Sequence, residues 1–365
     1  MVDTIQQFVE IESPSDVKAA VDRLGTVIAS RFRELGGQVR VHRAENAGNH
    51  IQVSFPARNQ RKPVLLLGHM DTVYPIGTIA KMPFRVSKGR ILGPGVADMK
   101  AGIALAFHVI EGLFDWNRGK FPRPLRLLLV SDEEVGSASS RPITETLASG
   151  AEAVLVLEPG QGPAGAVKTA RKGVGVYTLR VEGRAAHAGL DFEKGQNAIL
   201  ELSRQICAVS SLADPHRGVT VNVGRVSGGT RSNVVPADAT ASVDVRVRTQ
   251  QDAAELHGLI TALKPFNPNC KVTVTGSFNR PPLERSGGVI ALYEKARTIA
   301  KELGWDLEEA AVGGGSDGNF TAALGVPTLD GLGAVGGGAH SPEEFTVISE
   351  LPRRAALLAG LITQV

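Results

Sequence analysis

The sequence has few cysteines, no long apolar run and almost no excess of either charge. Its 365 residues include only two cysteines, Cys207 and Cys270, and neither lies in a CxxC pair or near a histidine. We therefore expect ordinary buried thiols rather than a disulfide framework, as is typical of a reducing compartment. A chain of this length can bury an adequate core without disulfides.

The charge balance and the apolar runs exclude two further classes of protein. Lys and Arg number 40 against 37 Asp and Glu, and this net charge of +3 is too small and too dispersed to indicate a nucleic-acid partner. No apolar run reaches about 18 residues, so we expect no membrane span. The first residues, MVDTIQQFVEIESPS, lack a basic segment followed by an apolar one, as a secretory signal requires. We therefore expect a cytoplasmic protein.

Glycine, by contrast, is abundant, with 42 residues that gather in short clusters. Apolar, strand-like runs flank most of these clusters, so they are not linkers. Glycines at strand ends let the backbone approach a ligand closely. At roughly 150 residues per domain, the length itself predicts two domains.

The first half of the chain predicts an α/β domain. Three short apolar runs, at residues 63–68, 125–130 and 153–157, are typical of strands buried on both faces. Helical spacing of apolar residues predicts helices over 1–36 and 99–113. Helices between such strands indicate a layered domain, with a mostly parallel central sheet and helices on both faces.

The pattern changes after about residue 170. The segments that follow have the order β-α-β-β-α-β of a ferredoxin-like α+β unit, and beyond about residue 284 the chain returns to helix, strand, glycine loop and helix. We therefore expect a ferredoxin-like domain, residues 171–283, inserted into an α/β domain formed by residues 1–170 and 284–365. The inserted domain has helices and an outer sheet face that could supply a dimer surface.

Polar side chains follow nearly every buried strand of the first domain. His69 and Asp71 follow the first apolar run, residues 132–134 (Asp-Glu-Glu) follow the second, and Glu158 follows the third. Asp98 lies in a glycine-rich loop before a helix, and His340 follows another such loop. In an open parallel sheet, the carboxyl ends of the strands meet at one crevice, where sites form. We therefore expect these side chains to converge.

Three carboxylates beside two histidines carry too much negative charge to lie together without cations, because like charges at such distances would force protonation. The set is His69, Asp98, Glu134, Glu158 and His340. A pair of divalent cations resolves the repulsion, and mixed imidazole and carboxylate ligands suit zinc, with cobalt or manganese as substitutes. A single histidine after a strand is more often structural than a ligand, and we expect a structural role also for His108, inside the predicted helix 99–113. The prediction therefore depends on the whole set.

Several segments resemble the motifs of the di-zinc aminoacylase/carboxypeptidase family, in the right order along nearly the whole chain. That family includes acetylornithine deacetylase, succinyl-diaminopimelate desuccinylase and glutamate carboxypeptidase. The segments are GHMDTVYP (68–75), GPGVADMKAG (93–102), SDEEVGS (131–137), VLEPG (156–160), GRAAHAG (183–189), GGTRSNVVPADA (228–239), GGGSDGNF (313–320) and GAHSPEEF (338–345). The resemblance implies a zinc-peptidase-like catalytic domain with an inserted lid and dimerisation domain.

The resemblance also implies how the metal ligands divide. His69 and Glu158 would bind one zinc, His340 and Glu134 the other, and Asp98 would bridge the two ions. Two zinc ions per chain are thus expected.

Catalytic roles follow from the same resemblance. Glu133 would be the general base, and Asp71 would orient His69 from behind, as carboxylates do for metal-bound imidazoles. His187 resembles the lid-domain histidine that stabilises the oxyanion, contributed by the partner chain of a homodimer.

Within the family, the first three motifs are closest to glutamate carboxypeptidases of the carboxypeptidase G type. Arg246 and Arg280 resemble carboxylate-binding arginines of that branch, and Asn233 and Ser316 resemble further substrate contacts. We therefore expect hydrolysis of an amide bond next to a free carboxylate, with release of a C-terminal glutamate-type amino acid from a small peptide. The alternatives are a deacylase acting on N-acyl amino acids and an inactive binding protein on the same fold.

Overall fold

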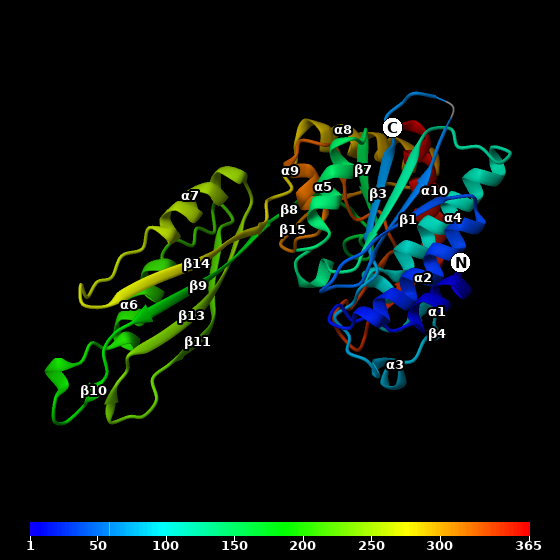
Figure 1. Cartoon of the computed structure of the whole chain (residues 1–365). Helices are drawn as coiled ribbons and strands as arrows, with labels where there is room; N and C mark the ends of the chain where they lie inside the picture. Colours follow the sequence, from blue (N-terminus) through cyan, green and yellow to red (C-terminus); the bar gives the residue numbers. More distant parts are fainter. Residues whose placement is uncertain (58) are drawn as a thin grey trace. The chain divides into compact units, whose positions relative to one another are not determined.

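The computed structural model describes residues 1–57 and 59–365, which form two compact units. The first unit consists of Met1–Ala170, Glu284–Val312 and Ser316–Val365, and the second of Arg171–Leu283 and Gly313–Gly315. Figure 1 colours the chain from blue to red and shows that both chain ends belong to the first unit.

A six-stranded sheet forms the centre of the first unit. In spatial order its strands are β1 (Gln38–His42), β2 (His50–Phe55), β6 (Leu125–Val130), β3 (Val64–His69), β7 (Ala153–Val156) and β16 (Thr328–Leu329). The last four strands are parallel, whereas β1 and β2 form an antiparallel edge. The predicted α/β class with a mostly parallel sheet is confirmed.

Alternate residues of β3 enter two different cores, which shows that both faces of the sheet are covered. Val64 and Leu66 belong to a large core, whereas Leu65 and Leu67 belong to a smaller one. The large core is built with α1 (Val2–Val9), α2 (Lys18–Glu34), α4 (Ala101–Trp116), α8 (Gly287–Glu302) and α10 (Leu351–Gln364). The smaller one contains α5 (Arg141–Ser149), beside which lies α9 (Gly318–Ala323).

The prediction of one helix over residues 1–36 was wrong, because the chain breaks between α1 and α2. Pro14 lies in the break; it has no N–H to donate to a helix, and it forms an isolated bridge with Thr72. The Ser15 hydroxyl donates to Asp71 Oδ2 at 2.7 Å. The interruption therefore places the Ser15 side chain against Asp71, in the loop that follows β3.

A small antiparallel sheet, which the sequence did not predict, joins two distant loops of the first unit. Its order is β17 (Gly336–Gly337), β18 (Phe345–Val347), β5 (Arg90–Leu92) and β4 (Arg85–Ser87). Phe345 pairs with Leu92, so the loop between β17 and β18 lies near the loop that follows β5. Elsewhere in the first unit lie α3 (Thr78–Lys81) and β15 (Glu309–Val312), which pairs with β8 (Val167–Arg171), a strand whose last residue begins the second unit.

The second unit is a four-stranded antiparallel sheet with helices packed on one face. The strands are, in spatial order, β11 (Thr220–Gly228), β13 (Asp238–Val247), β9 (Gly173–Glu182) and β14 (Lys271–Arg280). With α6 (Ala198–Ser210) and α7 (Gln250–Thr261), they follow the predicted β-α-β-β-α-β order along the chain. A separate two-stranded ribbon pairs β10 (Ala186–His187) with β12 (Val234–Val235). In this unit Cys270 is buried, but Cys207 is exposed, which corrects the expectation of two buried thiols.

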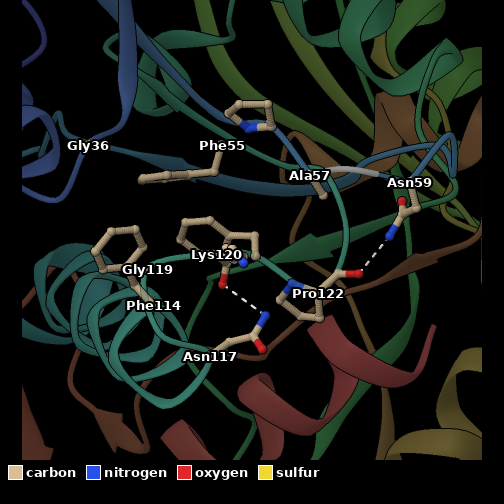
Figure 2. A pocket seen from close by; sticks show the side chains of 11 residues that line it. Gly36, Phe55, Ala57, Asn59, Phe114, Asn117, Gly119, Lys120 and Pro122 are labelled. Atoms are coloured by element: carbon tan, nitrogen blue, oxygen red, sulfur yellow. Dashed lines mark hydrogen bonds between the residues drawn. The ribbon is translucent and has the colours of Figure 1, made fainter.

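A pocket of about 630 Å³ lies at the amino end of β6, next to the end of β2 (Figure 2). Phe55, Phe114 and Phe121 line it, together with Asn59 and Lys120. Because β6 starts at this edge of the sheet, the pocket is at the opposite edge from the carboxyl ends of the parallel strands. The polar residues singled out above are not part of it. No helix within residues 1–57 and 59–365 is both long and apolar enough to cross a membrane.

Candidate metal centre

The parallel strands of the first unit bring acidic and imidazole side chains to one edge of the sheet. His69 is the last residue of β3 and pairs with Val130 at the end of β6. Glu134 lies in the short turn Glu133–Val135 that follows β6, and Glu158 lies two residues beyond β7. The register thus delivers residues from three strands to the same place, as expected for the carboxyl ends of parallel strands.

Asp98 lies between the two histidines. Its Oδ1 is 3.0 Å from His69 Nε2, and its Oδ2 is 3.4 Å from His340 Nε2. Each imidazole also faces a carboxylate of its own. His69 Nε2 lies 3.5 Å from Glu158 Oε1, and His340 Nε2 lies 3.2 Å from Glu134 Oε2. The cluster therefore has two halves that share Asp98, the same division that the motif resemblance implies.

The cluster fits divalent cations. Ligand atoms of His69, Asp98 and Glu134 all lie within 4.8 Å of one another. Glu134 Oε1 is buried and has no hydrogen-bond partner among residues 1–57 and 59–365, which is costly for a carboxylate oxygen. Three carboxylates with two imidazoles form a mixed O and N ligand set of the kind that zinc prefers. A shared carboxylate between two such halves is typical of a two-metal site.

The carboxylates of the cluster favour the charged form of both imidazoles. Burial disfavours a charged His69 ring, but hydrogen bonds with Asp71, Asp98 and Glu158 raise its pKa well above the ordinary value. Hydrogen bonds with Asp98 and Glu134 raise the pKa of His340 to about 10. Burial opposes ionisation of Asp98 as well, yet the two imidazoles hold its pKa far below its usual range. The site thus attracts positive charge strongly.

Asp71 connects the histidine of β3 to the acidic turn after β6. Its backbone oxygen lies 3.0 Å from His69 Nδ1, and its Oδ1 lies 3.5 Å from the same atom. Its carboxylate also accepts the backbone N–H groups of Glu133 and Glu134, at 3.3 and 3.2 Å, and the Ser15 hydroxyl. The residue is fully buried, so it can fix the His69 ring and the acidic turn in one geometry.

Glu133 and His187 lie in different units. Glu133 begins the turn Glu133–Val135 and is partly buried. His187 is exposed in the second unit, and its Nδ1 accepts the backbone N–H groups of Gly189 and Leu190, both at 3.1 Å. Because Nδ1 accepts, the proton of a neutral ring must be on Nε2, which makes that atom a hydrogen-bond donor.

The four residues expected to contact substrate are placed very differently. Arg280 is 8% exposed, and its Nη1 donates to Asn279 Oδ1 at 3.0 Å. Arg246 is partly exposed, and its Nε and Nη2 donate to the two carboxylate oxygens of Asp244 at 2.9 and 3.1 Å.

The other two of these residues differ in exposure. Asn233 is exposed, and its backbone carbonyl accepts the Ala188 N–H. Ser316 is fully buried, and its hydroxyl donates to Asp330 Oδ2 at 2.6 Å. The structure thus uses the Ser316 hydroxyl inside the first unit.

Sequence reasoning missed three residues that support the cluster, namely Ser15, Tyr74 and Glu344. Tyr74 and Glu344 lie inside the motifs GHMDTVYP and GAHSPEEF, which were the available signal, but they received no role. Tyr74 Oη lies 2.6 Å from Glu344 Oε2. Ser15 had no signal of its own beyond its neighbour Pro14.

Comparison with known proteins agrees with the cluster. The profile of peptidase family M20/M25/M40 matches residues 65–364. Carboxypeptidase G2 of Pseudomonas sp. (strain RS-16) is 32% identical over 370 residues, which cover 99% of this chain and 88% of that protein.

Solved structures share the fold at lower identity. The aminopeptidase PepT from Bacillus cereus ATCC 10987 has a TM-score of 0.80 at 23% identity, with 99% of this chain and 97% of that chain covered. The YXEP protein of Bacillus subtilis, described as a dinuclear metal-binding peptidase from the M20 family, has a TM-score of 0.70 at 15% identity. The coverage there is 99% of this chain and 96% of that chain.

Proposed function

The chain belongs to peptidase family M20/M25/M40, and from that premise we propose that it is a two-metal carboxypeptidase. Its substrate is a small peptide whose C-terminal residue, of glutamate type, is released by hydrolysis of the amide bond beside a free carboxylate. The ions are zinc, with cobalt or manganese as substitutes.

One observation carries this proposal. The Asp98 carboxylate points one oxygen at His69 and the other at His340, and each histidine has its own second carboxylate. An acidic cluster built for structure alone would pair its carboxylates with Lys, Arg or backbone N–H groups. Here Glu134 Oε1 is buried without such a partner in the described part of the chain. Two bound cations would supply the positive charge that these carboxylates lack.

When bound, two divalent cations polarise the substrate carbonyl and acidify the attacking water. Glu133, adjacent to the ligand Glu134, takes a proton from that water and later delivers it to the leaving amine. Asp71 holds the backbone of both glutamates and the ring of His69, so the base and one half of the cluster keep a constant separation. His187 donates from Nε2 to the developing oxyanion.

Arg246 and Arg280 supply recognition of the substrate carboxylate. A guanidinium presents paired N–H groups that match a carboxylate, which favours a free C-terminus over an amidated one. The name of the relative, a carboxypeptidase, and the closeness of the motifs to the carboxypeptidase G branch support this choice over an N-acyl amino acid deacylase.

A substrate panel with metal analysis tests the proposal. Protein prepared in zinc should hold close to two equivalents per chain. It should release glutamate from short peptides faster than it deacylates N-acetyl or N-succinyl amino acids. Preference for an N-acyl amino acid would replace the carboxypeptidase with the deacylase. A chain that holds no metal and hydrolyses nothing would overturn both.

The homodimer and the cytoplasmic location expected from the sequence belong to the same proposal. Sedimentation equilibrium of the zinc-loaded chain tests the first, and fractionation of the native cells tests the second.

A further inference from the structure

A glutamate next to the cluster is buried more completely than any of the expected metal ligands. Glu344 has 0% exposure and lies four residues after His340, immediately before β18. The residue is not aimed at either histidine. Its carboxylate contacts the backbone of the loop that carries Asp98 and the side chain of Tyr74.

The hydrogen bonds of Glu344 fill its whole capacity to accept. Oε1 accepts the N–H groups of Ala97 and Asp98 at 2.7 and 2.9 Å. Oε2 accepts the N–H of Gly95 at 2.9 Å and the hydroxyl of Tyr74 at 2.6 Å. A carboxylate has about four acceptor sites, so two donors on each oxygen saturate it. A side chain with any donor of its own cannot replace it here.

These four contacts join the three loops from which most of the cluster comes. Tyr74 lies in the loop that follows His69, and Gly95 to Asp98 form the loop that ends at the shared carboxylate. Glu344 itself follows His340, and Tyr74 Oη also lies 2.9 Å from the carbonyl of Ser341, next to that histidine. One buried side chain therefore touches all three loops.

We propose that Glu344 is a positioning residue that holds Asp98 midway between His69 and His340, so that the two ions bind with the correct separation. The inference rests on the proposed two-metal centre. It deepens that proposal by assigning the placement of the shared ligand to a residue that binds no metal.

The physical reason is the weakness of the local backbone as a support. Asp98 lies three residues before α4, in a segment whose backbone dihedrals at Asp98 and Met99 are not helical, so the backbone N–H groups there need acceptors from elsewhere. Glu344 supplies acceptors for three such groups, and the buried Lys100 ammonium, which donates to Ile11 O at 2.8 Å, lies within its electrostatic reach. Without the carboxylate, the Asp98 loop loses its acceptors and can shift relative to both histidines. Mutation of a residue that supports a metal ligand typically lowers metal affinity by about 10–100-fold.

Glu344→Gln tests the proposal, with Glu343→Gln as the matched control. The amide keeps the size of the side chain, but in either orientation its NH2 group faces at least one backbone N–H donor. Glu343 is exposed and lies in the same loop, so its variant has the same change of charge without the contacts. Zinc affinity is measured by competition with a chromophoric chelator, and thermal unfolding is measured on the metal-free chains.

The folded Glu344→Gln chain should bind zinc about 10–100-fold more weakly and lose kcat with KM near the parental value. The control should match the parent. A purely structural role would instead lower the melting temperature of the metal-free chain while the folded fraction bound zinc normally, which would overturn the inference. If the parent itself bound no zinc, the proposed function would have failed rather than this inference.

Tyr74→Phe keeps the test decisive if Glu344→Gln does not fold. It removes a single hydroxyl and leaves the three backbone contacts of Glu344 in place. Its zinc affinity should fall roughly 2–10-fold, the range of one hydrogen bond. Affinity within the error of the parental value would contradict the proposed link between the His69 loop and Glu344.

Discussion

The two halves of the candidate metal centre are built in different ways. The side chain of His69 is 1% exposed, and the residue is the last of a strand that is buried along its whole length. The side chain of His340 is 50% exposed and lies in a glycine-rich loop, with a backbone φ of +63°. A left-handed φ costs about 1–2 kcal/mol for a residue other than glycine. One half is thus supported by the core of the sheet and the other by a loop.

The support behind each ring differs in the same direction. The second nitrogen of His69 faces Asp71, which is itself fixed by Ser15 and by two backbone N–H groups. The half-exposed ring of His340 faces Asp98 and Glu134 through Nε2. We therefore expect the buried half to retain its ion firmly and the exposed half to exchange its ion readily.

Removal of the metal ions should have the largest effect on activity, and it also tests whether the two halves differ. Exhaustive chelation should abolish activity, because in the proposed two-metal centre both ions would act on the same carbonyl and water. At increasing chelator concentration one equivalent should leave first, and Glu134→Ala should lack that equivalent while it keeps the other. Metal analysis after each chelation step measures this. Simultaneous loss of both ions would mean that the two halves do not differ.

Glu133 and Glu134 separate catalysis from metal binding at adjacent positions. Glu133→Ala should retain both ions and the fold but lose about 10²–10⁴-fold in kcat, the usual contribution of a general base. Glu134→Ala should lose activity through the loss of an ion and should recover part of it in excess zinc. Single-turnover rates together with metal content distinguish the two. Exchange of the two phenotypes would reverse the assignment.

His187 extends the comparison to the second unit, where an exposed imidazole is expected to act on the reaction. His187→Ala should keep both ions and lose about 10²–10³-fold in kcat, as for one oxyanion donor. A loss of only a few-fold would make the residue structural.

If His187 acts on the partner chain's site, two inactive variants should complement each other. Co-refolding of His187→Ala with Glu133→Ala gives heterodimers in about half of the random pairings, each with one working site. Roughly a quarter of parental activity should then return. Heterodimers without activity would restrict His187 to its own chain.

The two arginines also differ in burial, and we expect their replacement to have the smallest effect on activity. Arg280→Ala should raise KM for free-acid peptides by roughly 10–100-fold, because a hydrogen bond to a charged group contributes about 1.5–3 kcal/mol. Arg246→Ala should cost less, since Asp244 already neutralises that guanidinium. Amidated peptides, measured in parallel, should lose little in either variant. Equal losses on both substrates would remove the clamp.

The parts of the fold that the sequence predicted are those with a strong local signal. Residues 63–68 were recognised as a strand because a strand buried on both faces is apolar at every position. The five expected ligands were identified because each follows a strand or a glycine loop, and the structure brings them together, although their individual roles stay predictions. The break after α1 was missed although Pro14 signalled it, because the apolar spacing resumes beyond the break.

The support of the cluster could not be predicted in the same way. Glu344 and Gly95 are 249 residues apart, and their contact is made by a backbone N–H, which has no signature in a sequence. Ser316 presents the opposite case. Its motif suggests contact with substrate, which stays a prediction, and the contact that the structure shows is a buried hydrogen bond from its hydroxyl to Asp330, a residue 14 positions further along.

The division of the first unit into separate segments affects the order in which the chain can be completed during synthesis. The buried core of the second unit lies within residues 177–270, and β14, which completes its sheet, ends at Arg280, so the unit is available once those residues have left the ribosome. The first unit still lacks β16, α10 and His340 at that point. Between Leu283 and His340 lie another 56 residues, which take about 3–11 s at 5–20 residues per second. During that interval the newborn chain has His69, Asp98 and Glu158 but lacks His340, so an early ion would meet only one half of the site.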